Sequence, residues 1–304
     1  MTMEASGILI VNKPAGLSSH GVVNRIRRIF GTKTVGHCGT LDPMATGVLP
    51  ILVGRAVKAS EFLKDHDKAY LASVELGITT DSFDTTGNVL TRFDGELPAF
   101  SDFKAVAKSF EGTFMQMPPM YSALKVGGIK LVNLARQGIE VERTPREVTI
   151  RNLTPFEKDG KLFIDVDCSK GTYIRTLCYD IGERLGCGAA MSSLCRTRVG
   201  EFDIKNSHTI EELASMSEEE LIACLIPIDS LFMDLPRIFL PKFYAGLYKN
   251  GCEIYFKKLR PAGIDRNAVG VLYRVYGEDG FIALGESAEY AKGVALKARK
   301  MFFN

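Results

Sequence analysis

Asp42 lies in a stretch whose other residues are mostly small or apolar, "GHCGTLDPMATGVLP" (36–50), and His37 precedes it by five positions. No Lys or Arg in this stretch could neutralise the carboxylate. Asp before Pro is common in turns, because the carboxylate bonds its own backbone and Pro fixes φ. A turn role is therefore one interpretation of Asp42. The other is that the glycines let a substrate approach closely and that Asp42 acts as a nucleophile.

Several common catalytic signatures do not occur in the sequence. The Walker A loop, GxGxxG, GxSxG, HExxH and the deaminase pair HxE and PCxxC are all missing. The seven cysteines form no CxxC pair, and Cys178, Cys187 and Cys195 match no zinc spacing. We therefore expect reduced thiols, no metal and no cofactor. The chemistry is then left to Asp, Tyr, Arg and His side chains.

The elements that position these side chains follow from local patterns. Residues 7–16, "GILIVNKPAG", are typical of a buried strand that ends in a Pro-Gly turn. Residues 18–31 predict a helix that begins at Ser18 or Ser19 and ends at Gly31. Residues 69–77 alternate between apolar and mixed positions, which predicts a strand with Tyr70 on the apolar side.

Residues 161–186, "KLFIDVDCSKGTYIRTLCYDIGERLG", predict a strand, a turn and a helix in succession. Thr172 is the expected N-cap of that helix, and Gly186 is its expected end. Strands and helices alternate irregularly along the whole chain. This favours an α+β fold over a doubly wound parallel sheet.

The composition indicates an ordinary globular protein, with 46% hydrophobic and 24% charged residues. No signal peptide or membrane-spanning run is evident, so we expect a soluble cytoplasmic protein. A linker around Leu235 leads into a β-rich tail with 12 Lys and Arg against 6 Asp and Glu, whereas the preceding residues have 26 against 30. This surplus is either a solvated surface or the footprint of a polyanionic partner.

Five blocks in order resemble the TruB family of tRNA pseudouridine synthases. They are "NKPAGLSSHGVVNRIRR", "VGHCGTLDPMATGVLPILVGRAVK", "DKAYLASVELGITTDSFDTTG", "MYSALKVGGIKLVNLARQGIEV" and "CSKGTYIRTLCYDIGERLGCGA". Together they cover nearly all of residues 7–200. The resemblance implies a pseudouridine synthase domain with a central mixed or antiparallel sheet over residues 1–234. It also implies a small β-rich, PUA-like RNA-binding domain over residues 235–304.

The resemblance also implies a reaction. Such an enzyme isomerises uridine 55 in the T-loop of tRNA to pseudouridine without a cofactor, after flipping the base into a pocket. Asp42 would then be the nucleophile, attacking C1′ or C6 or promoting a glycal route. Arg175 matches the arginine that pairs with this Asp and keeps it ionised. Tyr70 matches the tyrosine that stacks on the uracil and can serve as a base. Taken without the family, Arg175 is an ordinary helix-surface residue and Tyr70 a core aromatic.

Four further residues match positions near the family's substrate. His37 corresponds to the histidine that inserts into the T-loop, Tyr173 to a pocket tyrosine and Leu194 to an apolar wall for the base. Lys13 is expected near the pocket, although a Lys before Pro is equally typical of a surface turn. Outside the resemblance, His37 would be a turn residue and Leu194 a core residue.

Residues 118–146 correspond to the family's insertion that clasps the T-loop. Its basic residues would meet RNA phosphates: Lys125, Lys130, Arg136, Arg143 and Arg146. This insertion favours a stand-alone enzyme over the relatives that work with a guide RNA. We also expect a monomer that binds the tRNA T-arm and requires no protein partner. Two other functions stay open, a non-catalytic RNA-binding or RNA-chaperone protein and a synthase that acts on a different RNA. The set Asp42, Tyr70 and Arg175 argues against the first, because binding alone does not need it.

Overall fold

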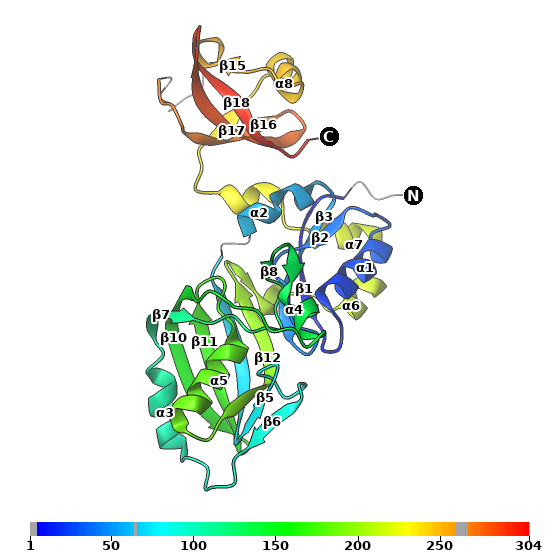
Figure 1. Ribbon diagram of the computed structural model, residues 1–304. Helices are drawn as coiled ribbons and strands as arrows, with labels where there is room; N and C mark the ends of the chain where they lie inside the picture. Colours follow the sequence, from blue (N-terminus) through cyan, green and yellow to red (C-terminus); the bar gives the residue numbers. More distant parts are fainter. Residues whose placement is uncertain (1–4, 64–65, 260–264, 266, 304) are drawn as a thin grey trace.

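The computed structural model describes residues 5–63, 66–259, 265 and 267–303. Figure 1 shows two separate β-sheets, a large one in the body of the molecule and a smaller one formed by the C-terminal residues. Helices flank the large sheet, which gives the α+β architecture expected from the sequence. Within the described residues, no helix is both long and apolar enough to cross a bilayer.

The central sheet has nine strands in the order β1-β3-β12-β4-β11-β10-β7, with β2 paired to β3 and β13 to β12. Its one parallel pair is β3 with β12, and the other pairs are antiparallel, so the predicted mixed sheet is confirmed. The strands are β1 (Gly7–Lys13), β2 (Val35–His37), β3 (Thr46–Val53), β4 (Lys68–Leu76), β7 (Gly112–Gln116), β10 (Arg146–Lys158), β11 (Lys161–Cys168), β12 (Ala189–Val199) and β13 (Phe202–Asp203).

The helices cover this sheet with apolar faces. In α1 (Ser19–Ile29), Val22, Val23 and Ile26 are buried, and the Ser18 side chain caps the helix by accepting from the Gly21 N–H. The helices α3 (Phe100–Lys108) and α5 (Ile174–Leu185) pack against each other and against the sheet. The shorter helices are α2 (Ser60–Leu63), α4 (Leu131–Ala135), α6 (Ile210–Ser215) and α7 (Glu218–Ala223).

The start of α5 corrects one prediction. Its N-cap is Tyr173, not Thr172, and the Tyr173 side chain makes no capping hydrogen bond. Thr172 instead donates its hydroxyl to the Ser169 carbonyl, so it stabilises the turn after β11. The other end is as predicted, because Gly186 adopts φ +74° and terminates the helix.

The segment expected as an insertion forms a hairpin and a short helix. Strands β8 (Lys125–Val126) and β9 (Ile129–Lys130) form a hairpin through Gly127 and Gly128, both at positive φ, and α4 follows directly. Leu131 anchors α4 with 1% of its surface exposed.

A second hairpin, outside the insertion, pairs β5 (Ile78–Thr80) with β6 (Val89–Arg92) and carries the loop of residues 81–88 between its strands.

The smaller sheet has the order β14-β16-β17-β18-β15, and α8 (Lys242–Lys249) packs on it. Its strands are β14 (Arg237–Phe239), β15 (Ile254–Tyr255), β16 (Leu272–Gly277), β17 (Gly280–Tyr290) and β18 (Gly293–Met301). The segment expected as a linker is therefore partly a strand, β14. The preceding 3-10 helix (Ile228–Phe232) places Phe232 against Phe62 of the body and against Phe281 and Phe302 of the tail. These aromatic contacts join the two sheets.

Candidate active site

Asp42 lies in the loop between β2 and β3, and backbone contacts hold this loop in place. The Ser19 hydroxyl contacts both the N–H and the carbonyl of Leu41, and the Gly16 N–H donates to the Pro43 carbonyl at 2.8 Å. Gly39 adopts φ +78°, a conformation that favours glycine. The Asp42 side chain keeps 36% of its surface exposed, so its carboxylate is fixed but accessible.

Arg175 lies in the first turn of α5, far from Asp42 in the sequence, and its side chain contacts Asp42. Its Nε lies 2.9 Å from Oδ2 of Asp42, and 5% of its side chain is exposed. The other guanidinium nitrogens donate to the carbonyls of Ser82 and Tyr121 at 2.9 and 2.7 Å. The structure therefore brings Asp42 and Arg175 together, and it excludes the alternative that Arg175 is a helix-surface residue.

A second carboxylate faces the same guanidinium. Asp84, 5% exposed, has Oδ2 at 3.6 Å from Nη1 of Arg175. Its Oδ1 accepts from the Ser82 hydroxyl and the Thr86 N–H. Asp84 was not among the predicted site residues. The signal was present, since Asp84 belongs to the quoted block "TTDSFDTTG" in the loop between β5 and β6.

Tyr70 and Arg196 are paired across neighbouring strands. Tyr70 on β4 is 7% exposed and lies opposite Arg196 of β12, whose guanidinium is close enough to act on the phenol. Burial raises the pKa of Tyr70 to about 12, and Arg196 acts in the opposite direction. Arg196 was not predicted. It follows Leu194 on the same face of a strand, and a charged residue at an apolar-face position was the signal that could have found it.

Tyr173 is fixed by its backbone. Its N–H donates to Oε1 of Gln116 at 2.8 Å, and its carbonyl accepts from Nε2 of the same side chain at 3.0 Å. Burial raises the pKa of Tyr173, and Asp42 lies close enough to raise it further. Gln116, 2% exposed on β7, thus holds the residue that precedes α5, although sequence reasoning missed it.

Lys13 is fully buried at the end of β1, which excludes the surface-turn alternative. Its ammonium donates to the carbonyls of Pro14, Leu17 and Pro43 at 2.9, 2.6 and 3.2 Å. Burial lowers the pKa of Lys13 to about 8, and the nearby Asp42 opposes that shift. Lys13 therefore helps to fix the Asp42 loop through its hydrogen bond to the Pro43 carbonyl.

His37 and Leu194 flank the same region. His37 ends β2 and is half-buried, and its Nδ1 has no hydrogen-bond partner among the described residues. Burial lowers the pKa of His37, and the charges of His20 and Arg196 lower it further. Leu194, 7% exposed on β12, belongs to the same buried cluster as Tyr70 and Leu41.

Four of the five basic residues expected to meet phosphates are exposed. They are Lys125, Lys130, Arg136 and Arg146. Lys125 and Lys130 are cross-strand partners, and Arg146 lies close enough to lower the pKa of Tyr173. Arg143 differs, because its side chain is 19% exposed and bonds the Pro118 carbonyl and Glu140. Arg143 therefore connects the start of the insertion, at Pro118, with its later part, at Glu140.

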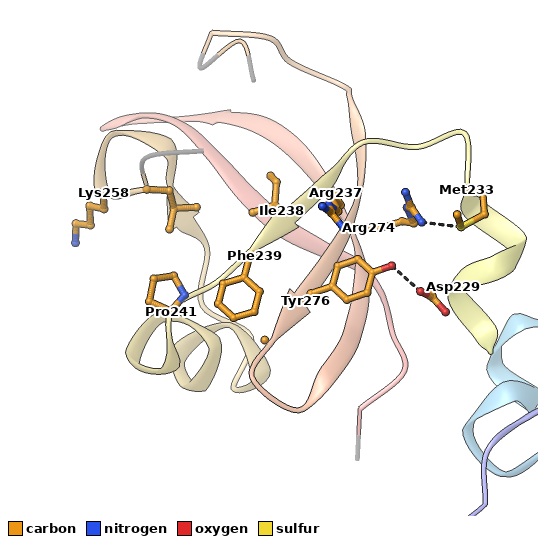
Figure 2. A pocket seen from close by; sticks show the side chains of 11 residues that line it. Asp229, Met233, Arg237, Ile238, Phe239, Pro241, Lys258, Arg274 and Tyr276 are labelled. Atoms are coloured by element: carbon orange, nitrogen blue, oxygen red, sulfur yellow. Dashed lines mark hydrogen bonds between the residues drawn. The ribbon is translucent and has the colours of Figure 1, made fainter. Parts of the chain in front are cut away.

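A pocket of about 1230 Å³ lies elsewhere, where the C-terminal sheet meets the preceding 3-10 helix. Figure 2 shows Arg237, Arg274, Phe239 and Tyr276 around it, with the Tyr276 hydroxyl bonded to Asp229 at 2.6 Å. Phe239 is 61% exposed. The pocket combines cations with an accessible aromatic ring and contains none of the residues around Asp42.

Among the described residues, no group of three His, Cys, Asp or Glu side chains is arranged to hold a metal ion. No disulfide joins the seven cysteines, all of which lie among the described residues. The groups around Asp42 that can do chemistry are therefore a fixed carboxylate, buried guanidinium groups and a buried phenol.

Comparison with known proteins identifies the family. Residues 27–174 match the model of the TruB family pseudouridylate synthase N-terminal domain, and residues 175–233 match that of the tRNA pseudouridylate synthase B C-terminal domain. The chain is 41% identical to tRNA pseudouridine synthase B of Clostridium tetani, over 93% of this chain and 96% of the relative. It is 40% identical to the protein of that name from Clostridioides difficile, over 97% and 99%.

Solved structures agree with this assignment. A chain from a Cbf5-Nop10-Gar1 complex has a TM-score of 0.67 and 26% identity, covering 98% of this chain and 85% of that one. A chain from the archaeal box H/ACA sRNP Nop10-Cbf5 complex also has a TM-score of 0.67, with 25% identity over 99% and 87%. The matches to both family models and to relatives along nearly the whole chain show that it belongs to the TruB family of pseudouridylate synthases.

Proposed function

We propose that this protein isomerises uridine 55 in the T-loop of tRNA to pseudouridine, with Asp42 as the nucleophile. The observation that carries the proposal is the Asp42 carboxylate, accessible at 36% exposure and held 2.9 Å from a buried Arg175. Curated relatives named tRNA pseudouridine synthase B support the substrate. A carboxylate bonded to a planar guanidinium is held in one orientation, which a nucleophile requires.

The reaction breaks the bond between C1′ and N1 of the uridine and forms a bond between C1′ and C5. Asp42 attacks C1′, attacks C6 or promotes a glycal route, and each of these needs an ionised carboxylate beside the ribose or the base. The proton on C5 then leaves and N1 gains one from solvent, so the product is an isomer of the substrate. Side chains alone supply this chemistry, and the proposal includes no cofactor.

The neighbouring residues act on the flipped base. Tyr70 stacks on the uracil and takes the C5 proton, and Tyr173 and Leu194 form the walls of the pocket. His37 enters the T-loop, where its ring replaces stacking that is lost when the base leaves. Lys13 supports the Asp42 loop through its bond to the Pro43 carbonyl. The cross-strand position of Tyr70 beside Arg196 and its closeness to Asp42 support this arrangement.

The rest of the RNA is bound through its phosphates. Lys125, Lys130, Arg136 and Arg146 are exposed on or beside the insertion, and phosphate contacts supply affinity without base specificity. Arg143 acts indirectly by bonding Pro118 and Glu140. Because the insertion, residues 118–146, gives the chain its own RNA-binding segment, we propose that it acts without a guide RNA. We also propose that it acts in the cytoplasm as a monomer and needs no protein partner.

Residues 1–234 form the catalytic domain in this proposal, and residues 235–304 form a PUA-like RNA-binding domain. The pocket beside β14 supports the second role, since Arg237, Lys258 and Arg274 line it together with the exposed Phe239 (Figure 2). Cations beside an accessible aromatic ring suit single-stranded or frayed RNA.

The proposal is tested by tritium release from tRNA transcript that carries [5-³H]uridine. Wild type should release tritium without added metal, and Asp42→Asn should release none while its tRNA affinity stays within a few-fold, because phosphate contacts elsewhere supply most of the affinity. Asp159→Asn, on the β10–β11 turn, is the matched control and should match wild type. Full activity in Asp42→Asn contradicts the nucleophile. Release only from a transcript other than tRNA contradicts the substrate.

A further inference from the structure

Arg196 is a buried cation without an ion-pair partner among the described residues. It is 1% exposed and is one of the largest fully buried side chains in the protein. Its Nε donates to the Val48 carbonyl at 2.7 Å, and its Nη2 donates to the Gly39 carbonyl at 3.0 Å. Burying a charge is costly unless the site gains from it, so this guanidinium needs an explanation beyond packing.

Its contacts link three parts of the candidate site. Gly39 belongs to the loop that carries Asp42, Val48 belongs to β3, and Tyr70 belongs to β4. Two glycines, Gly39 and Gly47, let the backbone pass close to Arg196. A Cβ at Gly39 would lie 3.3 Å from Nη1, and one at Gly47 would clash with the Arg196 carbonyl oxygen. Both glycines have positive φ, so the loop and β3 approach this residue as only glycine permits.

The geometry points to Arg196 as a positioning residue that holds the Tyr70 hydroxyl against the Asp42 loop and stabilises the Tyr70 phenolate that removes the C5 proton. This inference rests on the proposed function. The phenol first releases its proton to solvent. The phenolate oxygen then takes the C5 hydrogen as a proton, and the electron pair of the C5–H bond forms the C5–C6 double bond. The pair that C6 had shared with N1 moves onto N1, which takes a proton from solvent.

The groups that face Tyr70 agree with this role. Arg196 faces it from β12, Cys168 from β11 and Asp42 from the β2–β3 loop. Burial, Cys168 and Asp42 all raise the pKa of Tyr70, whereas Arg196 lowers it. Burial also raises the pKa of the Cys168 thiol to about 11, so the thiol is neutral near pH 7. Arg196 is therefore the cation that favours the phenolate.

A double-mutant cycle separates this role from a merely structural one. The variants are Arg196→Lys, Tyr70→Phe and the two combined, with Arg198→Lys as the matched control. Arg198 lies on the same strand and pairs with the partly exposed Asp167 at 2.7 Å. Single-turnover tritium release and the Kd for tRNA are measured for each, and wild-type release shows first that the proposed function holds.

Arg196→Lys should slow single-turnover release about 10²-fold, the usual scale for a general base, while leaving the Kd nearly unchanged. Arg198→Lys should match wild type. In the Tyr70→Phe background, Arg196→Lys should cause little further loss, because both changes remove the same interaction. Losses that multiply, or a loss that is confined to the Kd, would overturn the inference while leaving the proposed function intact.

A second measurement leaves Arg196 unchanged. Site-specific 3-fluorotyrosine at position 70 lowers the pKa of that phenol in an otherwise wild-type chain. If the phenolate is the base, the rising limb of the single-turnover rate against pH should move to lower pH. A limb that stays in place would overturn the inference, even if Arg196→Lys fails to fold.

Discussion

The Nε atom of Arg175 lies 2.9 Å from Oδ2 of Asp42, and the same guanidinium faces Asp84 at 3.6 Å. The two carboxylates differ in exposure, since the side chain of Asp42 is 36% exposed and that of Asp84 is 6% exposed. A buried charge without a partner of opposite sign is costly. Asp84 supplies that partner for the buried guanidinium of Arg175. Asp42 is thus the carboxylate of the two that substrate can reach.

Arg175→Lys should damage both activity and stability. Lysine keeps the charge, but a single ammonium cannot reach Asp42 and the carbonyls of Ser82 and Tyr121 in the geometry of the planar fork. We expect kcat for tritium release to fall about 10²-fold. The free energy of unfolding in urea should fall by about 1–3 kcal/mol, because buried carbonyls lose their donors.

Arg184→Lys is the matched control for this prediction. Arg184 is on the same helix, but it donates to the exposed Ser109 hydroxyl and lies over the Phe110 ring. Its replacement should leave kcat unchanged. Equal losses in the two variants would mean that α5 as a whole, and not the contact to Asp42, explains the effect of Arg175.

Gln116→Met should reduce activity through Tyr173. The Gln116 amide bonds both the N–H and the carbonyl of Tyr173, so methionine leaves both of these backbone groups without a side-chain partner. The free energy of unfolding should fall by about 1–3 kcal/mol, and kcat should fall although Gln116 itself is not proposed to touch RNA. Gln137→Met, at an exposed position, should change neither quantity. Loss of stability with unchanged kcat would contradict a link to the site.

The sequence predicted most of the architecture because periodic patterns report burial directly. The alternation that contains Tyr70 became β4, and Ser18 and Gly186 act at the helix ends where they were expected. Thr172 was wrong because a side chain near a helix start can bond a turn instead of the helix N–H groups. Local preference cannot choose between these partners.

The site itself was predicted in part. Asp42 and Arg175 came from the family resemblance, and their contact was expected, but their distance and the second carboxylate, Asp84, depend on tertiary packing. Arg196 and Gln116 act through backbone carbonyls and amides of other elements. Such contacts depend on strand order, which in this chain places β12 between β3 and β4. No local pattern encodes that order.

Arg237→Glu should weaken tRNA binding without changing single-turnover chemistry. Arg237 is exposed beside the pocket of the C-terminal sheet, and a phosphate contact there adds affinity that depends on salt. The slope of log Kd against log salt concentration should shrink by about 1. Lys158→Glu makes the same charge change at the exposed end of β10 in the other sheet. If both variants weaken binding equally, net charge and not this pocket is responsible.

Lys13 should make stability depend on pH in the alkaline range. Burial lowers its pKa in the folded protein to about 8, against 10.5 for an ordinary lysine. Between these values the unfolded chain holds a proton that the folded chain has released, so the free energy of unfolding rises with pH across this window. Below pH 8 both states are protonated, and the cost of the buried charge is fully present.

The measurement compares wild type with Lys13→Met by urea unfolding at several values from pH 7 to pH 10.5. Other groups titrate in this range, but they are common to both proteins, so the difference between the curves isolates Lys13. Wild type should gain about 3 kcal/mol relative to Lys13→Met over the window. Lys158→Met, which removes an exposed lysine, should run parallel to wild type. If Lys13→Met also runs parallel, the three carbonyls that accept from Lys13 keep it charged throughout, and burial does not govern its titration.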